Sequence, residues 1–273
     1  MRVDFHLHSN ISLDSPEPME NIIQAAIDRG FDLICLTDHC DLIQHDVPGV
    51  SIGASSFAQW QRSYAEIARM RDKFGDQIEI LHGMELAEIP QDPEQARFNA
   101  SQPDLDFIIG SIHATSGVLD YHFLDYPDEA FCMALADVYL DENIRMAEMD
   151  LTDVLGHIGF INRYIVRAGL PLIDFMQFEE KLRHLFKILV ENGRGIEVNT
   201  SGLRQQGMGA PFPDLPILRL YKECGGEIVT IGSDAHRAAD VGLHFDKACE
   251  ILQTAGFRYQ TIFRQRKPAF IPL

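Results

Sequence analysis

The chain has 273 residues, 46% of them hydrophobic, and its 23 Lys and Arg against 41 Asp and Glu give a formal charge of −18. Such an acidic protein repels the phosphate backbone of long nucleic acids, so nonspecific nucleic-acid binding is not expected. The apolar runs are short and interrupted by charges, and the first residues carry histidines where a signal peptide needs an apolar stretch, so neither membrane insertion nor secretion is expected.

Strand-like and helix-like segments alternate along the chain. Short apolar runs rich in β-branched residues predict strands at 1–5, 32–37, 78–81, 105–109, 154–155, 195–198 and 228–231. Helical periodicity predicts helices at 19–29, 57–74, 127–149, 175–192, 216–224 and 240–255, and only a short helix fits between 86 and 104. This alternation is typical of βαβ units in an α/β fold with a parallel sheet.

About seven such units follow one another without a linker. This favours a single barrel domain over residues 1–273 rather than two small domains. An open, doubly wound sheet remains an alternative that the pattern does not exclude.

Residue types that bind metals follow six of the seven predicted strands. In chain order they are His6 and His8, Asp38 and His39, Glu85, His113, His157, and Asp234 with His236. The junction after 195–198 instead carries Asn199, Thr200 and Ser201. In a parallel barrel the C-terminal ends of the strands open at one mouth, so all of these side chains would face one site.

The first and last strands carry the same spacing of polar residues. His6 and His8 lie two apart on a strand and therefore point to one side, and Asp234 and His236 repeat this spacing. In a closed barrel these strands are neighbours, so the two pairs would face each other. Taken singly, such a histidine is more often an ordinary half-buried residue at a strand end than a metal ligand.

Two of the carboxylates allow more than one interpretation. Asp38 could be a metal ligand, a helix cap, or a group that fixes the orientation of a ligand ring. Glu88 is as good a candidate ligand as Glu85 on composition alone.

The combined set resembles the polymerase-and-histidinol-phosphatase (PHP) superfamily of metal-dependent phosphoesterases. Its HxH, DH, E, H, H and DxH motifs occur here in the same order, at the positions given above. The resemblance implies a distorted, TIM-like (β/α)7 barrel and two or three divalent ions, with zinc, manganese and iron as the candidates. Stand-alone members of about this size imply hydrolysis of L-histidinol phosphate in histidine biosynthesis.

The resemblance also implies three sets of metal ligands. The first set is His6, His8, Glu85 and Asp234, and the second shares Glu85 and adds His113 and His157. The third set is His39, His236 and a residue in the loop after His8. Many relatives have a histidine at that last position, where this chain has Asp14.

Such ions would supply the chemistry of a phosphatase. They lower the pKa of a bridging water toward neutrality, which gives hydroxide as the nucleophile, and they neutralise the phosphoryl oxygens. The proton for the departing alkoxide could come from water or from Asp38.

Several residues are candidates for contacts with the substrate. Arg163 and Arg204 are predicted to bind phosphate oxygens, although each could instead pair with a surface carboxylate. Asn199 and Ser201 could complete a hydrogen-bonding wall, and His122 could line the pocket.

The expected partner is a small phosphorylated substrate, with L-histidinol phosphate preferred because an acidic chain suits a cationic phosphomonoester. One alternative is a PHP phosphoesterase that acts on nucleotides, short oligonucleotides or phosphotyrosine. Another is a non-catalytic, metal-stabilised barrel that serves as an interaction module. Five cysteines without a CxxC pair favour a reduced, cytoplasmic protein, and the oligomeric state is left open.

Overall fold

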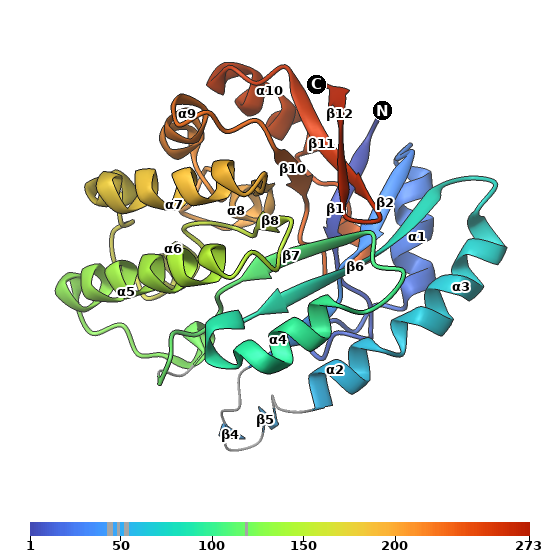
Figure 1. Cartoon of the computed structure of the whole chain (residues 1–273), viewed down its shortest axis with the longest axis horizontal. Helices are drawn as coiled ribbons and strands as arrows, with labels where there is room; N and C mark the ends of the chain where they lie inside the picture. The colour runs from blue at the N-terminus through green and yellow to red at the C-terminus, as the bar shows by residue number, and fades with distance from the viewer. Residues whose placement is uncertain (43–45, 48–49, 52–54, 118–119) are drawn as a thin grey trace.

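The computed structural model describes residues 1–42, 46–47, 50–51, 55–117 and 120–273. Seven parallel strands form a nearly closed barrel in the order β1-β2-β6-β7-β8-β9-β10. Their bounds are β1 Val3–Leu7, β2 Leu33–Leu36, β6 Glu79–Ala87, β7 Phe107–Ser111, β8 Val154–Leu155, β9 Gly195–Asn199 and β10 Val229–Gly232. Figure 1 shows the helices arranged around the outside of these strands. The prediction of a distorted, TIM-like α/β barrel is confirmed.

The helices lie at the periphery and bury one face each. Their bounds are α1 Met19–Asp28, α2 Ser55–Trp60, α3 Ser63–Phe74, α4 Pro93–Ala100, α5 Glu129–Glu148, α6 Asn162–Arg167, α7 Glu179–Glu191, α8 Ser201–Arg204, α9 Leu215–Glu223 and α10 Phe245–Ala255. Single 3-10 turns are η1 Ile89–Gln91, η2 Tyr121–Phe123, η3 Phe175–Phe178 and η4 Ala238–Asp240. Helix α1 is representative, because Met19, Ile22, Ile23 and Ala26 form its buried stripe at helical spacing. None of the described helices is long and apolar enough to cross a membrane.

Most predicted elements are present, with differences at their boundaries. The single helix expected at 57–74 is two helices, α2 and α3, separated at Gln61 and Arg62. The short α6 and α8 were not predicted, because six or four residues are too few to show a helical period. The short helix expected between 86 and 104 is α4.

Strand β6 continues to Ala87, well beyond the predicted end at residue 81. Gly83 allows this continuation, because a Cβ built there would lie 2.7 Å from Cys35 Sγ and 2.8 Å from a methyl of Thr37. Its absence lets β2 and β6 approach closely. The extension places Glu85 inside the strand rather than in a loop.

A short strand, β3 His39–Asp41, pairs with the far end of β6, so that His39 lies opposite Glu85. Strands β2 and β3 both pair with β6 and are therefore two parts of one strand, interrupted at Thr37 and Asp38. The interruption turns the Asp38 side chain toward the loop after β1. The interruption therefore positions both Asp38 and His39, two of the predicted site residues.

The barrel closes where β1 meets β10. Leu7 forms an isolated parallel bridge with Ala235, and the backbone N–H of His8 donates to the Ala235 carbonyl at 3.0 Å. The buried Asp4 carboxylate accepts the backbone N–H of Ser233 at 2.9 Å and that of Gly242 at 3.0 Å. These contacts hold together residues from the two ends of the chain.

An antiparallel hairpin, β11 Tyr259–Arg264 and β12 Lys267–Pro272, was not predicted. Arg266 in its turn forms an ion pair with Asp153, the residue before β8, and the N–H of Gln265 donates to Asp106, the residue before β7. The hairpin thus lies at the N-terminal end of the barrel, opposite the mouth. A second small pair is formed by β4 Asp46–Val47 and β5 Val50–Ser51.

His82 is a buried histidine that should make stability depend on pH. Its ring stacks on Trp60 with centroids 5.1 Å apart, and its Nε2 lies 2.6 Å from Ser63 Oγ. Burial, reinforced by the charge of Arg71, lowers the pKa of His82 to about 3. An unfolded histidine titrates near 6.5, so between these values the unfolded chain binds a proton that the native chain does not.

We therefore expect the metal-free protein to lose stability as the pH falls from about 6.5 toward 3, with His82 contributing up to about 1.4 kcal/mol per pH unit. Urea unfolding in chelator at pH 7 and pH 5 measures the effect. His82→Gln should reduce the difference between the two pH values. The same substitution at the exposed His184 should leave it as in the wild type. A His82→Gln protein with an unchanged pH slope would contradict the assignment.

Candidate metal centre

The predicted ligand-type residues converge on one cavity at the C-terminal ends of the strands. The cavity has a volume of about 400 Å³ and is lined by, among others, Asp14, His39, Glu85, His113, His157, Asp234 and His236. His6 and His8 are fully buried against it, pointing from the end of β1. The common site at the mouth of the barrel, which was predicted from the residues that follow the strands, is therefore present as a cavity in the structure.

Four side-chain atoms form a first cluster around the ends of β1 and β10. His6 Nε2 and His8 Nε2 each lie 3.4 Å from Glu85 Oε2. The same two nitrogens lie 3.8 and 3.5 Å from Asp234 Oδ1. Four ligands about 2.0–2.1 Å from a tetrahedral zinc ion are separated by about 3.3 Å, so this spacing suits a shared cation.

A second cluster uses the other oxygen of Glu85. Oε1 lies 3.0 Å from His157 Nε2 and 3.4 Å from His113 Nε2, and these two nitrogens are 3.4 Å apart. Oε2 also lies 2.9 Å from His39 Nδ1, so the two Glu85 oxygens face different sets of histidines, and the carboxylate could be shared between two ions. Glu88 does not line the cavity, and its carboxylate accepts hydrogen bonds from the backbone N–H groups of His113 and Ala114.

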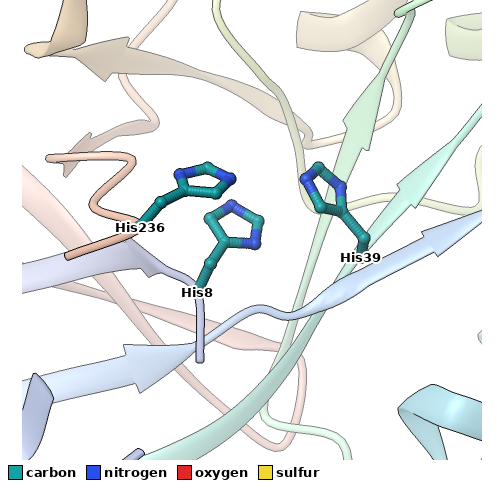
Figure 2. Close-up of side chains that lie close together, drawn as sticks. All are labelled: His8, His39 and His236. Atoms are coloured by element: carbon teal, nitrogen blue, oxygen red, sulfur yellow. The ribbon is translucent and has the colours of Figure 1, made fainter. Parts of the chain in front are cut away.

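A third cluster lies at the edge of the cavity, where three histidine rings come together (Figure 2). The His8 ring stacks on that of His236 at 4.1 Å and on that of His39 at 4.3 Å, measured between centroids. Asp14 Oδ2 lies 3.0 Å from His236 Nε2 and 3.5 Å from His39 Nε2. The aspartate thus faces both rings, with its side chain 58% exposed.

These residues fit divalent ions. In each of three groups of residues, one potential ligand atom per residue lies within 4.8 Å of the others. The groups are His6, His8 and Asp234; Glu85, His113 and His157; and His8, His39 and His236. Several buried donor atoms have no hydrogen-bond partner among the described residues, namely His6 Nε2, His8 Nε2, His39 Nδ1, Glu85 Oε2 and His236 Nε2. Unpaired buried polar atoms are costly, and their convergence is what a cation site requires. Imidazole with carboxylate suits zinc, manganese and iron.

The protonation of the cluster without a bound ion differs from residue to residue. Burial alone would lower the pKa of His6 and His39, but the charges of Glu197 and Glu85 around His6, and of Glu85 and Asp41 around His39, raise both well above the usual value, so these two rings hold protons that a metal ion would displace. Burial lowers the pKa of His8 to about 3, and repulsion from His236 and His39 adds to the effect, so its ring is neutral. Burial alone would raise the pKa of Glu85, but the charges of His39 and His6 hold it well below its usual range. Neutral imidazole and ionised carboxylate are the forms that bind metals.

Glu197, in β9, is a site residue that the sequence prediction missed. Its Oε1 lies 2.6 Å from His6 Nδ1, and its Oε2 accepts the backbone N–H of His157 at 2.9 Å. A carboxylate on the far nitrogen fixes the ring so that Nε2 faces the cavity. The signal in the sequence was a single charged residue within the apolar run GIEVN. In the structure this residue is fully buried.

Asp38 lies outside the lining of the cavity. One of its oxygens accepts the backbone N–H of Ser9 at 2.7 Å and Ser12 Oγ–H at 2.8 Å, and the other accepts Ser9 Oγ–H at 2.9 Å. Ser12 Oγ in turn lies 3.1 Å from His8 Nδ1. These contacts hold the loop after β1 and orient His8.

Arg163 is, among the described Lys and Arg residues, the one that lines the cavity. Its guanidinium lies over the Phe160 ring at 4.5 Å, donates to Ser201 Oγ, and lies 3.3 Å from Asp234 Oδ2. Asn199 accepts a hydrogen bond from Ser201 Oγ and donates one to Glu197, so it helps to fix the orientation of both side chains.

The remaining two predicted substrate residues lie in different places. Arg204 is outside the lining and donates to the backbone carbonyls of Ser233 and Asp234 at 2.7 and 3.1 Å. It therefore holds the turn that carries Asp234. His122 is exposed at the rim of the cavity, with its ring 5.9 Å from that of Tyr164.

Known proteins are similar to this chain over most of its length. A model of the PHP domain matches residues 4–201. The chain is 26% identical over 275 residues to a histidinol-phosphatase of Lactococcus lactis subsp. lactis, covering 97% of this chain and 96% of that protein. It is also 26% identical over 264 residues to a probable histidinol-phosphatase of Thermotoga maritima, covering 95% of each.

Among solved structures, the histidinol phosphate phosphatase of Lactococcus lactis, in complex with zinc, L-histidinol and phosphate, matches with a TM-score of 0.79. It is 26% identical to this chain, and the match covers 98% of each. The likeness therefore extends over the barrel as a whole.

Proposed function

The chain belongs to the PHP domain family, and from this premise we propose that it hydrolyses L-histidinol phosphate to L-histidinol and phosphate with divalent metal ions. The observation that carries the proposal is the convergence of unpartnered imidazole and carboxylate atoms on Glu85, beside Arg163. A relative alike over 98% of each chain holds zinc, L-histidinol and phosphate. A place in histidine biosynthesis follows from this substrate.

We propose that the three clusters hold the ions. His6, His8, Asp234 and Glu85 would form one site, and Glu85 with His113 and His157 a second. The edge cluster of His39, His236 and Asp14 would form a third. When bound, divalent ions lower the pKa of water and neutralise phosphoryl oxygens.

The chain's own side chains would bind and orient the substrate. The Arg163 guanidinium, held flat on Phe160, is placed to donate to phosphoryl oxygens. Asp38 would keep His8 in position, since its hydrogen bonds to Ser9 and Ser12 support a positioning role rather than proton donation. The contacts of Arg204 likewise support a role in fixing the Asp234 turn.

Arg163→Ala is expected to raise KM for L-histidinol phosphate by about 10- to 100-fold, as for the loss of a charge-assisted bond, with a smaller change in kcat. Steady-state kinetics at saturating metal measure it. Arg167→Ala, in the same helix but exposed and paired with Gln205, is the control and should leave KM unchanged. Unchanged kinetics in Arg163→Ala would place the guanidinium outside the substrate site.

Phosphate release from L-histidinol phosphate, compared with nucleotides, short oligonucleotides, phosphotyrosine and sugar phosphates, tests the substrate. We expect kcat/KM to be highest for L-histidinol phosphate. Equal or faster turnover of a nucleotide or of phosphotyrosine would replace the assignment with that activity. A protein that carries metal and hydrolyses none of them would instead be the non-catalytic barrel.

We further propose that residues 1–273 act as one domain in the cytoplasm. All five cysteines are free and unpaired, which supports a reducing compartment. The PHP model matches residues 4–201, and the two curated relatives described above match over 97% and 95% of the chain, which supports a single unit.

A further inference from the structure

The cavity has charged groups of opposite sign on two sides. Arg163 lies beside Asp234, at the end of the barrel where β1 meets β10. Two carboxylates, Asp41 and Asp120, line the wall around His113. A molecule bound in the cavity would therefore have both a guanidinium and carboxylates within its lining.

Neither carboxylate belongs to the three proposed metal sites, although Asp41 could bind a cation together with His39 and His113, whereas Asp120 belongs to no such group among the described residues. The cavity is lined by five carboxylates, and Asp14, Glu85 and Asp234 belong to the three clusters. Asp41 has His39 Nδ1 at 3.5 Å. Asp120 has no Lys, Arg or His within ion-pair distance among the described residues.

Asp120 is held in a fixed orientation. It precedes η2, and its Oδ1 accepts the backbone N–H of His122 at 2.7 Å, while the N–H of Tyr121 donates to the His113 carbonyl at 2.9 Å. No described residue donates to Oδ2. The turn thus fixes one oxygen and leaves the other for a ligand.

The surface between Asp120 and Arg163 is aromatic. Phe160 lies under the guanidinium, and its ring is 5.4 Å from that of Tyr164, which in turn is 5.9 Å from that of His122. Aromatic faces attract cations and accept flat apolar groups. Burying a carboxylate such as that of Asp120 without a counter-ion costs free energy, and a bound cation reduces that cost.

We propose that Asp120 is a specificity-determining residue that binds the ammonium group of the substrate's alcohol portion, with Asp41 adding to the negative potential. The inference rests on the proposed function and deepens it, because L-histidinol phosphate carries an ammonium two carbons from its ester oxygen. The site therefore selects cationic phosphomonoesters over neutral ones of the same size.

The test compares two substrates that differ only in this charge. O-Phosphoethanolamine keeps the O–C–C–N segment of L-histidinol phosphate, and propyl phosphate replaces the ammonium with a methyl group. We expect the wild type to have the higher kcat/KM for O-phosphoethanolamine. Asp120→Asn should lower this selectivity ratio about 10-fold or more, as for the loss of a hydrogen bond to a charged group. Asp120→Glu should retain part of it.

Asp125→Asn is the matched control, since Asp125 is exposed in the same segment and does not line the cavity. Its ratio should equal that of the wild type. Metal content is measured in each variant. Equal losses for both substrates in Asp120→Asn, or an unchanged ratio, would overturn the proposal.

Binding gives a second readout that does not need turnover. By calorimetry, metal-loaded protein should prefer L-histidinol over 3-(imidazol-4-yl)propan-1-ol, which lacks the amine, and Asp120→Asn should remove that preference. The two proposals can fail separately. Slow hydrolysis of L-histidinol phosphate with the charge preference intact would reject only the named substrate, whereas fast hydrolysis without a preference would reject only the role of Asp120.

Discussion

Glu85→Gln is expected to lower kcat at least about a thousand-fold, because a bound metal ion supplies several kcal/mol of transition-state stabilisation and each 1.36 kcal/mol is tenfold in rate. Glu85 Oε2 faces His6, His8 and His39, and Oε1 faces His113 and His157. An amide offers one oxygen, and its NH2 group cannot bind a cation. One substitution should therefore weaken two sites together.

Metal analysis of the purified variant tests this directly. We expect at least one equivalent fewer of zinc, manganese and iron combined than in the wild type, and no recovery of activity on addition of excess metal. Glu79→Gln is the control, because Glu79 begins the same strand and, among the described residues, forms an ion pair only with Arg264 at the surface. Wild-type metal content in Glu85→Gln would exclude a bridging carboxylate.

Glu197→Gln is expected to lower metal affinity about 10- to 100-fold, the usual cost of losing a carboxylate behind a ligating histidine. The carboxylate can only accept a hydrogen bond from His6 Nδ1–H, which keeps the lone pair on Nε2 directed at the cavity. A Gln amide can donate instead, which allows the tautomer that carries the proton on Nε2. That tautomer cannot bind a cation.

A metal titration distinguishes this effect from that of Glu85→Gln. In Glu197→Gln, activity should return as the metal concentration rises, because the ligands themselves are intact. The metal-free variant should unfold at a urea concentration close to that of the metal-free wild type, with any difference assigned to the buried amide. A variant that binds metal with wild-type affinity would show that Glu197 has no effect on His6.

The sequence predicted the fold and the candidate ligands for one physical reason. In a parallel barrel, residues that follow each strand share a mouth, so position along the chain alone indicates that His6 and Asp234 lie close together. The structure has these residues in one cavity, while their roles as ligands stay a prediction. The seven predicted strands are all present, because each is an apolar run bounded by turn residues.

Contacts that depend on side-chain reach could not be predicted in this way. Glu197 in β9 reaches past β10 to His6 in β1, and no local pattern shows which buried acid contacts which ring. The hydrogen bonds of Arg204 to the Ser233–Asp234 backbone are equally invisible in a sequence, where an arginine after a strand end looks like a phosphate ligand. The interruption between β2 and β3 was missed because three residues carry too little periodicity.

The meeting of β1 with β10 has a consequence for how the protein is made. The backbone N–H of Ser233 donates a hydrogen bond to the Asp4 carboxylate although the two residues are 229 positions apart in the chain. During translation His6 and His8 leave the ribosome long before Asp234 is added, so the nascent chain offers an incoming metal ion only part of the first cluster. We therefore expect high-affinity binding of the ion only after the barrel has closed, so that uptake of the ion would mark the end of folding rather than its beginning.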